Sequence, residues 1–595
     1  MKDRKIAGLL SGLAIAVCGQ VGAYAAPISQ VVSFGDSNAD AGLGAALSLS
    51  VFTGNPTPTV GSVGGRFSNG PVAVEDVAND LGVSLASYGV GGATTGTFAF
   101  GVIPGLLTQI PIYQASLAGQ SLPANALYVI TAGSNDLFGL TSTVPASTVA
   151  TATQNIQSAV TTLSNAGART IIVVNRTVRP DPTSVDNANG LVLNSALQTT
   201  VSTLDASLPA TVLYLDAYAI SSALQANPAA YGLTGGSTRC IDVPACISDP
   251  SGVGATYVRF DSAHLAQGAN AIIAEEMARL LVMQSAPSQV ALLPVLGVNV
   301  QRQDADNALA AGEFKGNEPV GTVRPIAVAQ YSEQNYDNPG HNADANVSGL
   351  MLGAKYKVSE QWVLGMLVGY DRIDIDRRAN QAGVDARQTY AFGTLQYADG
   401  RWAFDAAVGY GQTDYQRITR ESPVFAEGRV NSGDASGNSY GAVGKLSYDL
   451  YSANGMRIGP MLQVDSWRSK VGSYTEQGSD SSALHFDDFS VRSTRVGVGP
   501  RVRFDVGTAN HVGVEMSALY LRDIDSDESS ITASSPRFAF INHSAKGDRL
   551  DQETVALNLA LSGQWGPLQA RLGVSGRQGN DSRSIGSAAD ISYAF

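Results

Sequence analysis

The sequence predicts two different folds in one chain. The first is an N-terminal α/β three-layer sandwich around a parallel sheet. The second is a C-terminal transmembrane antiparallel β-barrel of about twelve strands. A length of 595 residues is too great for one compact domain. Short apolar runs alternate with amphipathic stretches up to about residue 290, and alternating-polarity segments separated by turns follow from about residue 320.

Residues 1–26 have the three parts of a secretory signal. Lys2–Lys5 is positively charged, Ile6–Val17 is apolar, and Ala23–Ala25 supplies a small-residue cleavage site. The apolar run is too short for a transmembrane helix, which needs about 20 residues. A lipoprotein signal at Cys18 is the less favoured alternative, because the preceding valine is bulkier than such sites usually carry. We therefore expect an exported protein.

Two cysteines, Cys240 and Cys246, remain after removal of such a signal. In an exported protein, a disulfide between them is favoured over two free thiols. Because the two positions are close in sequence, this disulfide would stabilise one surface turn. A catalytic cysteine is disfavoured, since no histidine lies nearby in the sequence.

Residues 27–290 have the pattern of an α/β domain. Amphipathic stretches predict helices that open at Asn69–Pro71 and close at Gly82, and that span Ala146–Ala166 and Leu191–Leu208. Alternation of such helices with strands is typical of a parallel sheet covered by helices. Four short apolar runs predict the buried strands: Val31–Phe34, Leu127–Ile130, Ile171–Val174 and Val212–Leu215.

Residues 320–595 have the pattern of an outer-membrane barrel. An even number of long antiparallel strands with aromatic residues near their ends is the signature of this architecture. A soluble β-sandwich is the alternative, but it explains neither the C-terminal Phe595 nor strands of this length. The predicted strands are Val323–Tyr331, Val347–Val358, Gln361–Arg372, Gln388–Ala398, Arg401–Tyr415, Ser439–Leu450, Arg457–Trp467, Arg492–Val506, His511–Arg522, Val555–Trp565, Leu568–Arg577 and Ser587–Phe595.

Residues 291–319 predict a linker with a helix. Gln301–Phe314 is polar and helix-forming, and Pro287 and Pro294 separate it from the amphipathic stretch Ile273–Gln284. A polar helix directly before a barrel would suit the water-lined lumen. A solvated linker is the alternative interpretation.

The overall charge and composition exclude some classes of ligand. A net charge of −13 argues against nucleic acid, whose phosphates need basic patches. No cluster of histidine and cysteine predicts a metal site, and the acidic run Asp523–Glu528 is expected to be an exposed barrel loop.

A candidate nucleophile, Ser37, follows the first predicted strand. Serine needs a base to take its proton, and only one histidine, His264, lies in the α/β half of the chain. Asp261 precedes it by three residues, a spacing that lets the carboxylate accept a hydrogen bond from the imidazole and fix its tautomer. The alternative is that His264 is an ordinary surface residue. Because it is the only histidine in the α/β half and lies in an Asp-x-x-His spacing, a catalytic role is favoured.

Acyl transfer also requires donors aimed at the developing oxyanion. The Gly-rich segment Tyr88–Thr95 can bring backbone amides close to a substrate. Thr131–Asp136 places an amide side chain at the end of a predicted strand. Taken singly, the first could be an ordinary turn and the second a helix cap.

Four blocks along residues 28–283 resemble, in order, those of the GDSL/SGNH hydrolase family. They are Gly35-Asp36-Ser37, Gly92, Gly133–Asp136 and Asp261–His264, and Gly65–Pro71 is similar to the lipase-like branch. The resemblance implies an SGNH-hydrolase sandwich with Ser37 as nucleophile, His264 as base and Asp261 as orienting acid. It implies an oxyanion hole formed by the amides of Ser37 and Gly92 and by the side chain of Asn135.

Two positions depart from the family pattern. Asn38 stands where the family name has Leu, and we expect an effect on packing rather than on chemistry. Leu265 follows the histidine where many members have Pro, so the local turn is expected to differ.

The signal, α/β passenger, linker helix and barrel together resemble a serine esterase/lipase autotransporter of Gram-negative bacteria. This resemblance implies type V secretion, insertion among outer-membrane lipids by the barrel-assembly machinery, and a surface-exposed passenger, which we expect to be monomeric. The expected activity is carboxylic ester hydrolysis on an ester or lipid substrate, without cofactor or metal. The apolar stretch Gly96–Leu107 could hold the acyl group or belong to the core.

Three other functions remain open. Some relatives in the family transfer acyl groups to an alcohol rather than to water. A non-catalytic surface adhesin on the same scaffold is a second alternative. A porin with an additional N-terminal domain is a third, which the linker disfavours.

Overall fold

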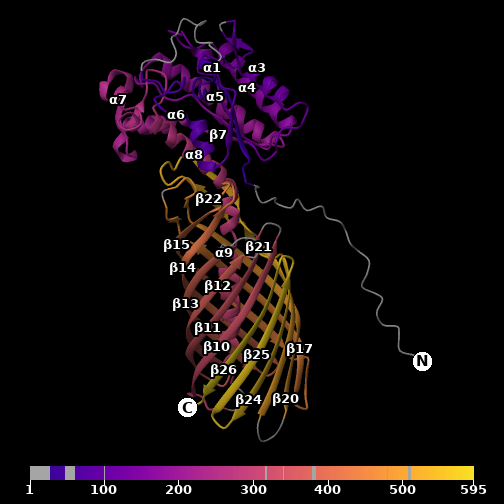
Figure 1. Ribbon diagram of the computed structural model, residues 1–595. Coiled ribbons are helices and arrows are strands. Elements are labelled where there is room, and N and C mark those ends of the chain that lie inside the picture. The colour runs from indigo at the N-terminus through magenta and orange to yellow at the C-terminus, as the bar shows by residue number, and fades with distance from the viewer. Residues whose placement is uncertain are drawn as a thin grey trace, which may run out of the picture.

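The computed structural model describes residues 27–46, 61–99, 101–314, 318–338, 341–377, 383–478, 480–506 and 511–595. An α/β sandwich stands at one end of a long β-barrel (Figure 1). This arrangement confirms the predicted fold class. The predicted signal, residues 1–26, lies outside the described residues.

A five-stranded parallel sheet forms the centre of the sandwich, in the order β2-β1-β5-β6-β7. The four predicted strands are all present. The fifth, β2, was missed because its residues, Ser-Leu-Ala-Ser, are small or polar and lie at the sheet edge. The strands are β1 Gln30–Gly35, β2 Ser84–Ser87, β5 Leu127–Thr131, β6 Thr170–Val174 and β7 Thr211–Leu215.

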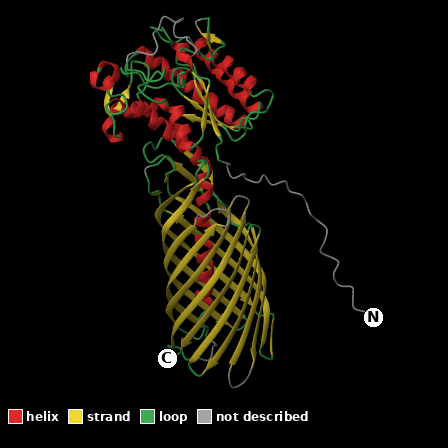
Figure 2. Cartoon of the chain, in the orientation of Figure 1, coloured by secondary structure: helices red, strands yellow, loops and turns green. Residues whose placement is uncertain are grey.

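Helices cover both faces of this sheet (Figure 2). Side chains alternate along each strand, so Val31 of β1 packs with α2, α6 and α8, whereas its neighbour Val32 packs with α3, α4 and α5. The helices are α2 Ala73–Leu81, α3 Leu106–Ser116, α4 Ala146–Asn165, α5 Val185–Ser207, α6 Ala217–Ala226 and α8 Gln267–Val290. Short helices and strands complete the sandwich: α1 Leu43–Ala46, β3 Phe98–Ala99, β4 Ile103–Pro104, β8 Thr234–Arg239, α7 Pro244–Ser248 and β9 Tyr257–Arg259.

Twelve long antiparallel strands form the barrel, which closes where β15 pairs with β17. The first strand, β10, also pairs with the last, β26. The strands are β10 Val323–Asn338, β11 His341–Lys357, β12 Trp362–Arg377, β13 Gly383–Asp399, β14 Trp402–Ser422, β15 Arg429–Tyr448, β17 Met456–Val471, β20 Phe489–Val506, β21 His511–Asp527, β24 Glu553–Trp565, β25 Leu568–Gly579 and β26 Ser582–Tyr593, with the short β16 Tyr451–Ala453 at one turn.

The outside of the barrel carries an apolar band between two rings of exposed aromatic side chains. Alternation along each strand places Leu350, Leu352, Met366 and Val368 outward. This pattern is typical of a lipid-facing barrel surface. One ring lies near the C-terminus of the chain and contains Tyr356, Trp362, Trp402, Trp565 and Tyr593. The other ring lies farther along the strands and contains Tyr331, Tyr370, Tyr410, Tyr440 and Tyr520.

Helices α8 and α9 (Leu292–Ala310) form a nearly continuous run from the sandwich into the barrel (Figure 1). Its most apolar window is long enough to cross a membrane, but 83% of that window is buried inside the protein. The prediction of a helix over Gln301–Phe314, separated from its predecessor by prolines, is wrong in its bounds. Pro287 lies in the last turn of α8, and Pro294 lies in the first turn of α9, where no intrahelical N–H bond is needed.

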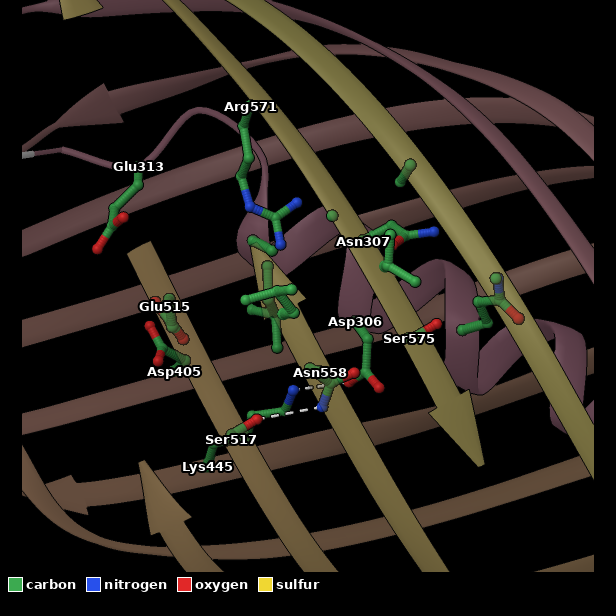
Figure 3. Close-up of a pocket in the computed structure, with 18 of the residues that line it drawn as sticks. Asp306, Asn307, Glu313, Asp405, Lys445, Glu515, Ser517, Asn558, Arg571 and Ser575 are labelled. Carbon is green, nitrogen blue, oxygen red and sulfur yellow. Dashed lines mark hydrogen bonds and ion pairs between the residues drawn. The ribbon is translucent and has the colours of Figure 1, made fainter. Parts of the chain in front are cut away.

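Buried ion pairs connect α9 to the barrel wall. Arg302 binds Asp465 of β17 at 2.7 Å, and Arg495 of β20 binds the same carboxylate at 3.2 Å. Farther along α9, Asp306 binds Lys445 of β15 at 2.7 Å. Charged and amide side chains around this second pair line a cavity of about 130 Å³ in the lumen (Figure 3).

The barrel loops that face the sandwich form a docking platform. The amide of Ile28, just before β1, donates to the carbonyl of Val424 at 3.1 Å, and Arg279 of α8 donates to the carbonyl of Ala483 at 3.1 Å. The amino end of β1 therefore faces the barrel, and its carboxyl end faces away. Four short strands pair within the platform: β18 Tyr474–Thr475, β19 His485–Phe486, β22 Ser530–Ser534 and β23 Asn542–Lys546.

The substitution Asp465→Asn tests how firmly α9 is held. It leaves the buried guanidinium groups of Arg302 and Arg495 without their shared counter-charge, so we expect a loss of about 3–5 kcal/mol in barrel stability. Thermal unfolding of the purified protein in detergent measures this loss. Asp374→Asn is the matched control, because Asp374 pairs with Arg372 at the exposed surface and should cost less than about 1 kcal/mol. Equal shifts for both variants would contradict the proposed role.

Candidate active site

The turn after β1 holds Ser37. Gly35 has a φ of +132°, and a Cβ there would lie 1.9 Å from the carbonyl oxygen of Thr131 on β5. Only glycine therefore allows the two backbones to approach this closely. The amide of Asp36 donates to the same carbonyl at 2.9 Å. The next residue, Ser37, is nearly buried but reaches a large cavity at the carboxyl end of the sheet.

The structure brings Ser37, His264 and Asp261 into one chain of hydrogen bonds. Ser37 Oγ lies 2.8 Å from His264 Nε2, and His264 Nδ1 lies 2.8 Å from Asp261 Oδ2. The amides of Ala263 and His264 both donate to Asp261 Oδ1 at 2.7 Å. The loop before α8 is therefore wound around one carboxylate, which fixes the direction of the imidazole.

The carboxylate of Asp261 stays ionised in this setting. Burial by itself raises the pKa of Asp261. The charge of His264 and the hydrogen bonds from His264 and Ala263 outweigh burial, and the pKa is lowered to about 2. An ionised carboxylate accepts the Nδ1–H bond and leaves Nε2 free to face Ser37 Oγ.

The stretch Gly65–Pro71 supports this loop from the side. The ring of Phe67 packs against the imidazole of His264, with ring centroids 5.0 Å apart. The side-chain oxygen of Asn69 accepts a hydrogen bond from the amide of Gln267 at 2.9 Å, at the first residue of α8. The motif therefore holds both the imidazole and the start of the helix that follows it.

Gly92 and Asn135 lie on the same cavity as Ser37 and His264. Gly92 has a φ of +85°, which favours glycine, and Asn135 Nδ2 donates to the carbonyl of Ala93 at 2.9 Å. The side chain of Asp136 accepts bonds from the amide and hydroxyl of Thr95 at 3.0 and 2.6 Å. These bonds join the Gly-rich loop to the loop after β5.

The cavity has a volume of about 980 Å³ and two unlike sides. Leu137, Phe138 and Leu140 form an apolar side that directly follows Asn135, and charged residues line the other side. Of the two interpretations left open for Gly96–Leu107, the described residues do not support the pocket, because none of them lines this cavity. Ala99, Ile103 and Leu106 are buried in the core instead, whereas Phe98 and Val102 are exposed.

Sequence reasoning missed two charged residues on the cavity wall, Arg176 and Arg179. Both follow β6, as Asn135 follows β5, and Asp186 at the start of α5 binds both guanidinium groups. The available signal was their position after a predicted strand, because the carboxyl ends of neighbouring parallel strands meet at one edge.

The two departures from the family pattern have different consequences. The expectation that Asn38 affects packing rather than chemistry stays a prediction; its side chain donates to Asp36 Oδ1 at 2.9 Å beside the nucleophile. Leu265 pairs with Arg259 in an isolated β-bridge beyond the histidine loop.

A disulfide joins Cys240 and Cys246, whose Cα atoms are 5.4 Å apart. Both residues are buried, not at a surface turn, and they pack with Phe260 and Ala266. The bond therefore lies beside the loop that carries Asp261 and His264. Among the described residues, no group of three or more metal-ligating side chains could hold a metal ion.

Comparison with known proteins accounts for most of the chain. Residues 31–277 match the family model GDSL-like Lipase/Acylhydrolase, and residues 327–577 match the autotransporter β-domain. Esterase EstA of Pseudomonas aeruginosa is 26% identical over 631 residues, covering 96% of each chain. An uncharacterized protein from the trpE-trpG intergenic region of Pseudomonas putida is 27% identical, covering 82% of this chain and 88% of that one.

Among solved structures, the translocator domain of the autotransporter NalP from Neisseria meningitidis has a TM-score of 0.40 and 12% identity, covering 51% of this chain and 97% of that one. The two family matches cover the two folded parts separately, and EstA aligns across both. The chain thus joins a GDSL lipase/acylhydrolase domain to an autotransporter β-domain, and it is homologous to the EstA esterase autotransporters.

Proposed function

We propose that this protein is a cell-surface carboxylic ester hydrolase that uses Ser37, His264 and Asp261 as a catalytic triad. The observation that carries the proposal is the Ser37–His264–Asp261 hydrogen-bond chain, with both bonds to the imidazole at 2.8 Å. A nucleophile, a base and an orienting carboxylate in this order are what acyl transfer through a serine requires.

The reaction proceeds in two steps. His264 Nε2 takes the Ser37 proton while Oγ attacks the ester carbonyl, and the same nitrogen then gives the proton to the leaving alcohol. Water, activated by His264, hydrolyses the acyl-enzyme and frees the carboxylic acid. Asp261 stabilises the imidazolium in both steps and remains ionised throughout.

The tetrahedral intermediate carries its charge on the former carbonyl oxygen. The amides of Ser37 and Gly92 and Nδ2 of Asn135 are the donors we assign to this oxyanion. One Nδ2 hydrogen of Asn135 is used by the Ala93 carbonyl, which fixes the amide plane and leaves the other hydrogen for the intermediate.

The position of the active site supports ester hydrolysis outside the cell. The amino end of the sheet touches the barrel platform, and the catalytic groups stand at its carboxyl end. His264 precedes α8, whose 24 residues span about 36 Å toward the barrel (Figure 1). We infer that the barrel, inserted by the assembly machinery, anchors the passenger at the outer surface with its pocket facing away from the membrane.

Ser37→Ala removes the nucleophile and should abolish hydrolysis of p-nitrophenyl esters. Barrel assembly should be unchanged, because Ser37 lies far from the barrel and the change removes one oxygen atom. Initial rates of the purified full-length protein measure the loss, and heat-modified electrophoretic mobility reports the barrel. Retained ester hydrolysis would exclude Ser37 as nucleophile.

Asn135→Ala should lower kcat by about 10²–10³ while KM changes little, because an oxyanion donor acts mainly in the transition state. The matched control is Asn125→Ala, an exposed asparagine before the other end of β5, which should leave kcat unchanged. A kcat for Asn135→Ala within a few-fold of the parent would contradict the oxyanion role.

Surface exposure can be tested on intact cells with a membrane-impermeant fluorophosphonate probe. We expect covalent labelling of the full-length chain without cell lysis, and no labelling of Ser37→Ala. Labelling that appears only after lysis would place the passenger inside the cell envelope.

A further inference from the structure

Three arginines gather beside the Ser37–His264 pair. Arg176 and Arg179 line the cavity wall, and Arg259 is fully buried behind them. The side chain of Arg176 is only 2% exposed, and its Nε has no hydrogen-bond partner among the described residues. A buried donor without a partner is costly, and this nitrogen is itself closed to solvent, so a ligand in the cavity would meet the outer nitrogens of the guanidinium groups.

The positive charge of this cluster is only partly balanced. Among the described residues, Asp186 forms ion pairs with both cavity arginines, at 2.5 Å from Arg176 and 3.0 Å from Arg179. The charges of Asp36 and Asp261 also act on Arg179 and Arg259, respectively, and oppose the lowering of each pKa by burial. Arg259 donates to the carbonyl of Val178, and within the described ranges its Nε and Nη1 have no hydrogen-bond partner. Burial, followed by the charge of Arg179, lowers the pKa of Arg259 to about 9.

The other charged residues on the cavity are held by partners of their own, although hydrogen bonds leave the two carboxylates among them charged. Asp40 accepts hydrogen bonds from backbone amides, including that of Gly91 at 2.8 Å. Asp181 is bound to Thr183 at the exposed rim. Arg239 pairs with Asp242 at 2.6 Å, so it adds no net charge.

The chemistry of the reaction places these arginines on the alcohol side of the ester. The leaving alcohol takes its proton from His264, so it must lie next to that imidazole. Arg179 donates to the carbonyl of Ala263, the residue before His264. The acyl side lies toward the oxyanion donor Asn135, where Leu137 and Phe138 continue the wall with apolar side chains.

We propose that Arg176 and Arg179 form an anion subsite, and that the preferred substrates are acyl esters whose alcohol carries a phosphate or carboxylate group. The inference rests on the proposed ester hydrolase function and specifies its substrate class. The guanidinium groups offer paired donors matched to such oxyanions, and the apolar wall accepts the acyl chain.

A matched pair of substrates tests the subsite: a monoacylglycerol and the 1-acylglycerol 3-phosphate with the same acyl chain. The full-length protein in neutral detergent should have a kcat/KM about tenfold or more higher for the phosphate ester. Arg179→Gln should remove most of this preference, and Arg179→Lys should retain part of it. Asp186→Asn should increase it, because the competing carboxylate is lost.

The charge-matched control is Arg169→Gln. Arg169 is exposed just before the other end of β6, so its loss should not change the ratio of the two kcat/KM values. Equal kcat/KM for the two esters in the parent protein, or the same ratio in Arg169→Gln and Arg179→Gln, would overturn the inference while leaving ester hydrolysis intact.

Binding to the Ser37→Ala protein tests the subsite without catalysis. Calorimetry should detect glycerol 3-phosphate but not glycerol, and Arg179→Gln in this background should abolish the signal. Binding with no hydrolysis by the parent would reject the proposed function and keep the anion subsite. Absence of glycerol 3-phosphate binding by a folded protein would reject the subsite.

Discussion

The helical run of α8 and α9 is the constraint on which the rest of the structure depends. Its first residue, Gln267, is held by Asn69 beside the His264 loop, and its far part is held in the lumen by Arg302 and Asp465. Because a helix is stiff along its axis, this run fixes the distance between the imidazole and the barrel. The platform loops then determine which way the sandwich faces.

The functional groups come together at the carboxyl ends of the parallel strands. Parallel strands all end at one edge, so the residues that follow β1, β5 and β6 meet there although they are far apart in sequence. Ser37, Asn135 and Arg176 come from these three strand ends. The opposite edge, where β1 begins, is used for docking. Because all strands run in the same direction, the substrate cavity lies at one end of the sheet and the attachment to the barrel lies at the other.

The sequence predicted features that rest on periodicity or on a residue type that is rare. Apolar runs and alternating segments predicted the strands, and a single histidine in the passenger predicted His264. It did not predict that Pro287 and Pro294 lie within helices, because a proline usually ends or kinks a helix; only Pro294 lies in a first turn, where proline is tolerated. Arg176 and Arg179 were missed because an arginine in a loop is ordinary until the fold shows that it faces the nucleophile.

The net charge of the chain and the local charge of its cavity lead to different conclusions about which anions the protein can bind. A total of −13 argues against binding a polyanion that covers a large surface. A small anionic group in the cavity experiences only nearby charges, since distant ones are screened by water and salt over about 10 Å. There the guanidinium groups of Arg176 and Arg179 share one carboxylate, and both arginine side chains are largely buried. An acidic protein can therefore favour an anionic substrate at one site, and the buried arginines decide that preference.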